Sequence, residues 1–504
     1  MIKFFQVHKL EIIIIIFLTG LYFLLRVPNL TLQPIFADEA IYIRWAQIMK
    51  AEPTLRFLPL SDGKTPLFMW AMAPFFKIFS DPLLAGRFLS VLSGYATFVG
   101  VLFLGWKNFG SRVGLWSAFL LSITPFMVFF DRMALVDTML AAFSVWSLNF
   151  ALLLIKYQRI DLAMCLGYLL GGGLLTKTPG MFNVLVLPVS ALAINWKTLN
   201  RQKTILKIFG LWLITLTITF GIYNALRLGP GFINLSSRNQ DYIFSPMDLV
   251  GRPLDPFLPH FNDLKDWFPK LLTLPVLLLI LSGAALSLYR KDKVAITILL
   301  WAILPMVVEM FLLKTFTARY ILFSIPPLIC LGGYILDQLV KKIKVPSLII
   351  TSLIAILPVL TVWQLLTRPD QVNLPRSERS GYFEAWTAGY GFPEIAQFLI
   401  SEAKKGTIIV GTEGTFGTLP DGLQIYLDQY FHLSPKGQEI VIMPDQATVS
   451  ARLRKEALKY PTYFVSNKSR FWGGDNLQLI KEFPKAVAPG GDQDKILLFK
   501  VLPE

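Results

Sequence analysis

Two acidic residues follow the first long apolar segment of the chain and begin a stretch with an amphipathic pattern. Asp38 and Glu39 come after the apolar residues at about 10–27, and Ala40 to Lys50 continue as a predicted helix. A carboxylate pair at the start of an amphipathic stretch beside a bilayer suggests chemistry at the membrane surface. The structural alternative makes Asp38 the N-cap of this helix and Glu39 a first-turn acid that the helix dipole favours.

A third acid, Asp137, stands at the outer end of another apolar segment, between Val136 and Thr138. A charged side chain costs roughly 2.5–3.5 kcal/mol at the centre of a bilayer and less near its surface. Such a residue usually faces an aqueous cavity, so Asp137 is a second candidate for chemistry. An ion pair with Arg132 is the structural alternative.

Basic residues are expected on the same side of the membrane. Lys64 precedes a helix that begins at Pro66, Lys177 lies in a tight turn, and Arg319 with Tyr320 opens a later span. Each cation alone could be an anchor that extends to lipid phosphates. Carboxylates and cations together on one face suggest a site that handles a phosphate and a hydroxyl.

The elements that must position these residues are membrane spans. Of the 504 residues, 54% are hydrophobic and only 16% are charged, which indicates an integral membrane protein. A spanning helix needs about 20 mainly apolar residues, and this criterion predicts about 11 spans. They lie near 10–27, 84–105, 113–130, 134–155, 161–176, 180–195, 206–226, 271–289, 294–313, 318–337 and 346–366, with a half-embedded helix at 66–79.

The distribution of Lys and Arg predicts the orientation. With the N-terminus inside, most basic residues of the short loops lie in the cytoplasm, so the formal charge of +15 reflects topology and not nucleic-acid binding. Residues 28–83, residues 227–270 and the tail after residue 366 then lie outside. Cys165 and Cys330 both fall in apolar segments, which excludes a disulfide framework and a metal–thiolate site.

The tail, residues 367–504, has a different character from the transmembrane part, residues 1–366. Helices are predicted at 391–404 and 449–458. Strands are predicted at Thr407, Ile440, Thr462 and Lys495, each with its following apolar residues. This alternation predicts a small extracytoplasmic α/β domain.

The order of these motifs resembles the pattern of glycosyltransferase family 39. The sequence Asp38-Glu39-Ala40-Ile41-Tyr42, the sequence Lys64-Thr65-Pro66-Leu67, Arg132 with Asp137, and Lys177 occur in the order and spacing of these GT-C membrane enzymes, over roughly residues 5–340. The family includes the protein O-mannosyltransferases and the aminoarabinose transferase of lipid A. The resemblance implies a GT-C-like helical membrane domain and transfer of a sugar from a polyprenyl phosphate to a hydroxyl of a protein, lipid or glycan.

The resemblance also implies roles for the residues. Asp38 is expected to be the base, Glu39 to support the loop or the acceptor, and Asp137 to provide a second carboxylate. The expected donor phosphate-binding residues are Lys64, Tyr42, Arg132, Lys177, Arg319 and Tyr320. Some relatives carry a metal-binding acid immediately before the loop lysine, where this chain has Gly63. A metal is therefore not asserted for this chain. A divalent ion held by Asp38, Asp137 and the donor phosphate stays an open alternative.

A transporter or flippase of a lipid-linked or anionic substrate is the rival class, because charges near spans also mark transport pathways. Such a protein usually has two matching halves with broken spans, and the sequence lacks this duplication.

Overall fold

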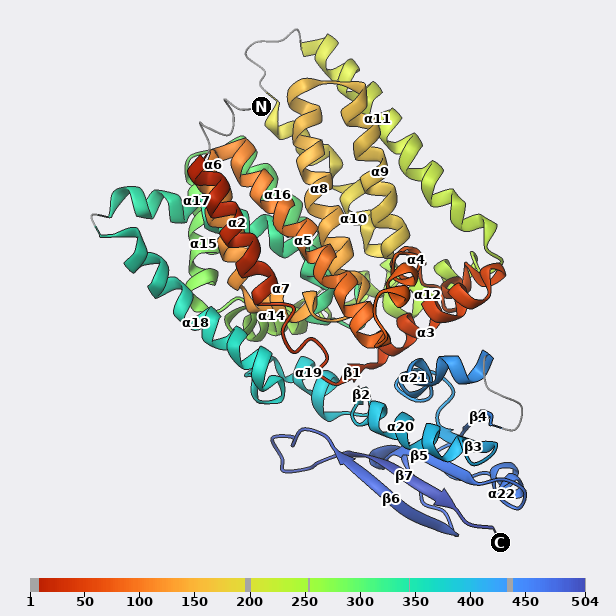
Figure 1. The fold of residues 1–504 in the computed structure, drawn as a ribbon. Helices are drawn as coiled ribbons and strands as arrows, with labels where there is room; N and C mark the ends of the chain where they lie inside the picture. The colour runs from red at the N-terminus through yellow and green to blue at the C-terminus, as the bar shows by residue number, and fades with distance from the viewer. Residues whose placement is uncertain (1–8, 195–200, 253, 344, 433–437, 504) are drawn as a thin grey trace.

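The computed structural model describes residues 9–194, 201–252, 254–343, 345–432 and 438–503. It forms a helical bundle with a small α/β domain below one end in the view of Figure 1. Six helices among the described residues are long and apolar enough to cross a membrane, or up to eight if each of two bent helix pairs is one span. The protein is therefore a multi-pass membrane protein, as its composition predicts.

The predicted spans all correspond to helical elements. The long helices are α5 (Pro82–Phe109), α8 (Val136–Tyr157), α11 (Arg201–Tyr223), α16 (Lys293–Leu312), α17 (Ile325–Lys342) and α18 (Ser347–Thr367). The bent pairs are α6 (Ser111–Ile123) with α7 (Pro125–Asp131), at 63°, and α14 (Phe257–Leu271) with α15 (Leu274–Tyr289), at 118°. The prediction of about 11 spans also counts three shorter apolar segments: α2 (Lys9–Leu24), α9 (Ile160–Thr176) and Thr178–Ala193.

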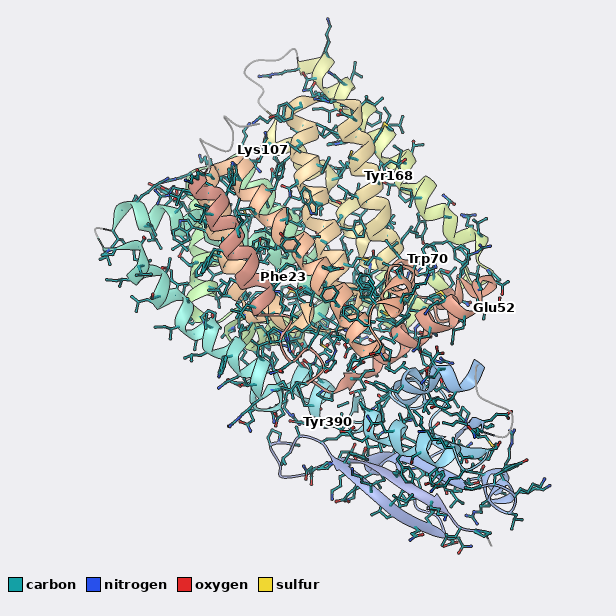
Figure 2. The ribbon with its side chains drawn as sticks, in the orientation of Figure 1. Phe23, Glu52, Trp70, Lys107, Tyr168 and Tyr390 are labelled. Carbon is teal, nitrogen blue, oxygen red and sulfur yellow. The ribbon has the colours of Figure 1, made fainter. Side chains whose placement is uncertain are left out.

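The two loops predicted to lie outside, called here the first and second outer loops, fold into short helices at the end of the bundle near the tail. The first loop contains α3 (Ala37–Ala51), η1 (Pro53–Leu55), η2 (Leu58–Asp62), α4 (Leu67–Met72) and η3 (Ala73–Lys77). The second contains η6 (Asn224–Leu228), α12 (Asn234–Tyr242), α13 (Pro246–Gly251) and α14. Figure 2 places Glu52 and Trp70, from the first loop, far from Lys107 at the opposite end of the bundle.

The tail forms a five-stranded sheet in the order β4-β3-β5-β7-β6. Strand β3 (Ile408–Glu413) pairs in parallel with β4 (Ile440–Asp445) and β5 (Thr462–Asn467), while β7 (Lys495–Val501) is antiparallel to β5 and to β6 (Leu477–Pro484). Besides the short α19 (Arg376–Arg379), the helices of the tail are α20 (Phe392–Ala403), α21 (Asp421–His432) and α22 (Ala451–Ala457). The predicted small sheet domain is confirmed; α21 and β6 were not predicted.

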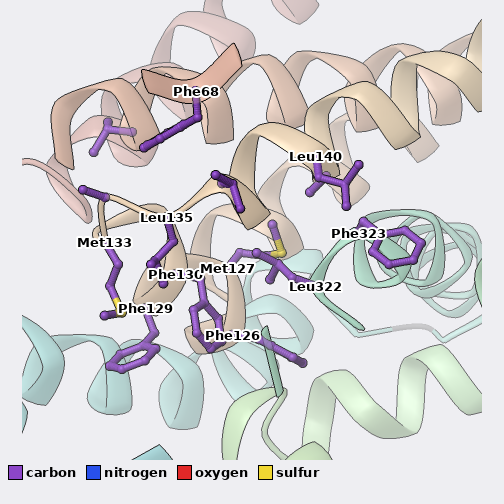
Figure 3. Packing of buried hydrophobic residues seen from close by; sticks show 14 of the residues in the cluster. Phe68, Phe126, Met127, Phe129, Phe130, Met133, Leu135, Leu140, Leu322 and Phe323 are labelled. Carbon is purple, nitrogen blue, oxygen red and sulfur yellow. The ribbon is translucent and has the colours of Figure 1, made fainter. Parts of the chain in front are cut away.

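A single large core joins the outer loops to the bundle. Figure 3 shows part of it, where Phe68 of α4, aromatic residues of α7 such as Phe129, and Leu140 of α8 gather near Leu322 and Phe323. The last two residues belong to η7 (Ala318–Ser324), the short helix that carries Arg319 and Tyr320. All five of these side chains are almost completely buried, so the core fixes the elements that present the polar side chains.

Candidate functional site

A cavity of about 370 Å³ lies among α3, α12, α16, η7 and the turn after α9. Six of the predicted site residues line it: Asp38, Tyr42, Lys64, Lys177, Arg319 and Tyr320. They come from the first outer loop, from the turn at the end of α9 and from η7. The fold thus brings together residues that are far apart in the sequence.

Asp38 lies between two cations. Its Oδ2 is 2.6 Å from Nη2 of Arg319, and its Oδ1 is 3.5 Å from Nζ of Lys64. Burial acts to raise the pKa of the Asp38 carboxyl, but the charges of Lys64 and Arg319 outweigh it, and the pKa lies well below its usual value. The N-cap of α3 is Phe36 and not Asp38, so the carboxylate is free of the capping role that the structural alternative assigned to it.

Lys64 is held by acids and aromatic rings. Its Nζ lies 3.4 Å from Oδ2 of Asp62, 5.2 Å from the ring centre of Tyr42 and 5.5 Å from that of Trp45. Asp62 also lies 3.8 Å from Arg238 on α12. Two cations of the cavity wall, Lys64 and Arg238, are therefore bridged by one carboxylate.

The surroundings of Gly63 explain why this chain has no acid immediately before Lys64, where some relatives have one. Its φ is +63°, and a Cβ at this position would lie 2.4 Å from Cβ of Arg238 and 2.6 Å from the carbonyl oxygen of Asn234. A larger residue would strain the backbone and collide with α12. An acid cannot replace Gly63 without moving α12.

Asp137 is behind the cavity wall and acts on it through Lys177. The Lys177 Nζ is 2.5 Å from Oδ1 of Asp137 and 4.3 Å from the ring centre of Tyr320, whereas Asp137 itself does not line the cavity. Gly180 makes the turn compact, because a Cβ there would lie 2.6 Å from the backbone of Gly173. The partner of Asp137 is thus Lys177 and not Arg132.

Arg132 and Glu39 support the first loop and do not line the cavity. Arg132 donates hydrogen bonds to the backbone carbonyls of Arg26, Pro28 and Asn29. Glu39 is fully buried and accepts two hydrogen bonds from Arg87, at 2.9 and 2.8 Å. It also accepts from the backbone N–H of Phe36 and from that of Ala134. Both side chains fix the entry to α3.

The tail contacts the elements that carry the site. Phe36, before α3, pairs with Ala388 in a two-stranded ladder of β1 (Ile35–Phe36) and β2 (Ala388–Gly389). Arg44 of α3 lies 2.6 Å from Asp428 of α21. Glu378 accepts a 2.9 Å hydrogen bond from the backbone N–H of Ala318, the residue before Arg319. The tail therefore packs against the elements that carry both partners of the Asp38–Arg319 ion pair.

Sequence reasoning missed three charged residues in or beside the cavity. Asp62 precedes the lysine loop, Arg238 lies in the second outer loop, and Glu309 lines the cavity from α16. Glu309 had a usable signal, because a lone acid within an apolar span is rarely without a role. Arg238 had none, since outer loops are ordinarily rich in charge.

The donor set offers little to a metal ion. Among the residues that the structure describes, no group of three or more His, Cys, Asp or Glu side chains could hold one. Asp38 contacts Arg319 and Lys64, and Asp137 contacts Lys177. Both carboxylates are therefore neutralised by cations of the chain.

The architecture is that of the GT-C membrane glycosyltransferases. The chain is similar to ArnT from Cupriavidus metallidurans in the apo state, with 16% identity, coverage of 99% of this chain and 98% of that chain, and a TM-score of 0.59. The same protein bound to undecaprenyl phosphate gives 15% identity, 98% coverage of both chains and a TM-score of 0.59. An Archaeoglobus fulgidus oligosaccharyltransferase tethered with an acceptor peptide gives 12% identity, coverage of 92% and 70%, and a TM-score of 0.52.

Within this architecture, residues 63–223 match the model of the dolichyl-phosphate-mannose-protein mannosyltransferase family. This segment begins beside Lys64 and includes Asp137 and Lys177. The resemblance to GT-C glycosyltransferases of the family 39 type is thereby confirmed. No curated protein matches the chain.

Proposed function

We propose that this protein transfers a sugar from a polyprenyl-phosphate donor to an acceptor hydroxyl at the outer face of the membrane. The observation that carries the proposal is the position of Asp38, an ionised carboxylate in a cavity wall that also presents Lys64, Lys177 and Arg319. The family match supports the class of donor, as does the undecaprenyl phosphate bound to ArnT.

Lys64 and Arg238 form the proposed binding site for the donor phosphate. Both residues line the cavity, and both contact the carboxylate of Asp62, Lys64 at 3.4 Å and Arg238 at 3.8 Å. Contacts of this length are easily exchanged for shorter ones to a phosphate, whose oxygens accept strong hydrogen bonds from cationic donors. Tyr42 lies under the ammonium group of Lys64 and limits its movement.

The reaction that fits this arrangement is a single displacement. The acceptor oxygen attacks the anomeric carbon as the bond from that carbon to the phosphate oxygen breaks, and Asp38 takes the proton of the hydroxyl. The phosphate leaves with both electrons of the broken bond, and the cations stabilise its negative charge. Attack opposite the leaving group inverts the anomeric configuration.

Donor binding also improves Asp38 as a base. In the free protein its carboxylate is stabilised by Lys64 and Arg319, so its affinity for a proton is low. When Lys64 turns to the donor phosphate, which is itself negative, Asp38 loses part of that stabilisation. Its proton affinity rises, as base catalysis requires.

The roles of the other predicted residues follow their positions. We propose that Arg319 and Tyr320 orient Asp38, that Asp137 holds Lys177, and that Glu39 and Arg132 keep the first loop in place. We further propose that residues 1–366 form the transmembrane domain and that residues 367–504 form a second domain on the extracytoplasmic side of the membrane. Supporting this location, the tail packs on α3 at the end of the bundle opposite Lys107.

A transporter fits the arrangement less well. Transport sites lie near the middle of the membrane between two repeated halves. In this protein the charged residues gather beside the tail, in loops and at helix ends. This gathering favours chemistry on a substrate presented at one face.

The test is replacement of Asp38 in a strain that lacks the gene. Asp38→Asn keeps the shape of the side chain and removes its basicity, and Glu52→Gln is a matched control at the exposed end of the same helix. Mass spectrometry of envelope glycans, glycolipids and secreted proteins should find a glycosylated product with the wild type and with Glu52→Gln. Restoration of that product by Asp38→Asn would reject Asp38 as the base.

A further inference from the structure

Glu309 is a buried acid of the cavity to which the mechanism above gives no role. It lies on α16, its relative exposure is 1%, and it lines the cavity. Its Oε2 atom has no hydrogen-bond partner among the residues that the structure describes. An unpaired buried acceptor is costly, so a partner from outside the protein is to be expected.

The neighbouring charges do not supply that partner. Lys177 and Asp137 are the charged groups that act on Glu309. The Lys177 ammonium group already lies 2.5 Å from Oδ1 of Asp137 and over the ring of Tyr320. One cation thus faces two acids, and Glu309, whose side chain lines the cavity, keeps an unused acceptor in Oε2.

The cavity divides into regions according to what its walls can bind. Lys64 and Arg238 form the phosphate region, and Asp38 lies next to it, 3.5 Å from Lys64. Lys177 and Glu309 form the other polar wall, which Tyr320 connects to Arg319 and so to Asp38. A donor with its phosphate in the first region and its anomeric carbon near Asp38 would direct the rest of its sugar ring toward Glu309.

We propose that Glu309 accepts a hydrogen bond from a ring hydroxyl of the donor sugar and thereby determines which sugar is transferred. This inference rests on the proposed function and adds to it the subsite for the sugar. A site built to bind a hydroxyl discriminates strongly against an analogue that lacks it, because its own buried polar group is then left unpaired. Glu309 is in this sense a specificity-determining residue.

The experiment compares lipid phosphates with and without a sugar. Full-length protein in nanodiscs is titrated with undecaprenyl phosphate and with undecaprenyl-phosphate-linked glucose, mannose and arabinose. The wild type should bind at least one sugar-bearing lipid more tightly than undecaprenyl phosphate. Glu309→Leu should reduce that preference about 10- to 100-fold, and should leave the affinity for undecaprenyl phosphate within about twofold.

Two further variants separate the possible failures. Glu309→Gln keeps a carbonyl acceptor and should fall between the wild type and Glu309→Leu. Lys64→Met should weaken the binding of all four lipids by a similar factor. The inference is overturned if the wild type prefers no sugar-bearing lipid or if Glu309→Leu keeps the wild-type preference. It is also overturned if Glu309→Leu weakens the binding of undecaprenyl phosphate as much as that of the sugar-bearing lipids. Unchanged binding of all four lipids by Lys64→Met would instead contradict the proposed phosphate site.

Discussion

The Oδ2 atom of Asp38 lies 2.6 Å from Nη2 of Arg319. Asp38 belongs to the first outer loop, and Arg319 lies at the start of the apolar helical segment Ala318–Lys342. The tail contacts both sides of this pair: β2 pairs with the strand before α3, and Glu378 binds the backbone N–H of Ala318. The pair is thus positioned by three separate parts of the chain. This arrangement would hold the proposed base, Asp38, in a defined orientation.

The pH dependence of transfer should depend on Lys64. Because the pKa of Asp38 is low, we expect its carboxylate to stay ionised well into the acidic range and activity to be lost only as the pH falls through that pKa. Lys64→Met removes the charge that lowers this pKa most, so the acidic limb of kcat/KM should move to higher pH. Lys77→Met, an exposed lysine of the same loop, is the control. An acidic limb at the same pH in both variants would show that Asp38 does not govern it.

Arg238 should be needed for binding of the donor phosphate. Loss of a hydrogen bond to a charged group costs about 1.5–3 kcal/mol, so Arg238→Ala should weaken undecaprenyl phosphate binding about 10- to 100-fold. Arg252→Ala is the matched control, because Arg252 lies in the same outer loop, forms an ion pair with Asp255 and does not line the cavity. Equal affinities of the two variants would remove Arg238 from the phosphate site.

The sequence could reveal the elements of the site but not their partners. Apolar length predicted each described helix that is long and apolar enough to cross a membrane, and about three spans more. The order of Asp38, Lys64, Asp137 and Lys177 predicted the fold family. Local sequence offered Arg132 as the alternative partner of Asp137, whereas the structure gives Lys177, because pairing depends on how α8 and α9 pack. Helix packing is a long-range property that composition and spacing do not encode.

The unpredicted elements have a similar explanation. Strand β6 has a largely exposed burial pattern, so it lacks the apolar alternation that identifies a half-buried strand. The ladder of Ile35 and Phe36 with Ala388 and Gly389 is only two residues long. Glu309 was detectable as an isolated acid in a span, but its access to the cavity required the positions of α12 and η7.

The contact of the tail with α3 should matter for transfer. Arg44 lies 2.6 Å from Asp428, and both side chains are partly shielded from solvent. Arg44→Ala and Asp428→Ala should each lower kcat severalfold through looser positioning of α3, and the double variant should be no worse than either, because both remove the same contact. The exposed pair Arg159 and Asp161 provides a control cycle with no effect on kcat. Independent, multiplying losses from Arg44 and Asp428 would contradict a shared positioning role.

The proposed site requires that the first outer loop and the tail face the same side of the membrane. In a background without Cys165 and Cys330, single cysteines at Ser61 and Gly474, both exposed, should react with an impermeant maleimide in intact cells. Cysteines at Arg159 and Lys342, exposed at the opposite helix ends, should react only after the membrane is opened, because the positive-inside rule assigns these ends to the cytoplasm. The readout is the mass shift of the labelled protein. If Ser61 and Gly474 labelled from opposite faces, or if Arg159 labelled in intact cells, an outer site made from the loop and supported by the tail could not exist.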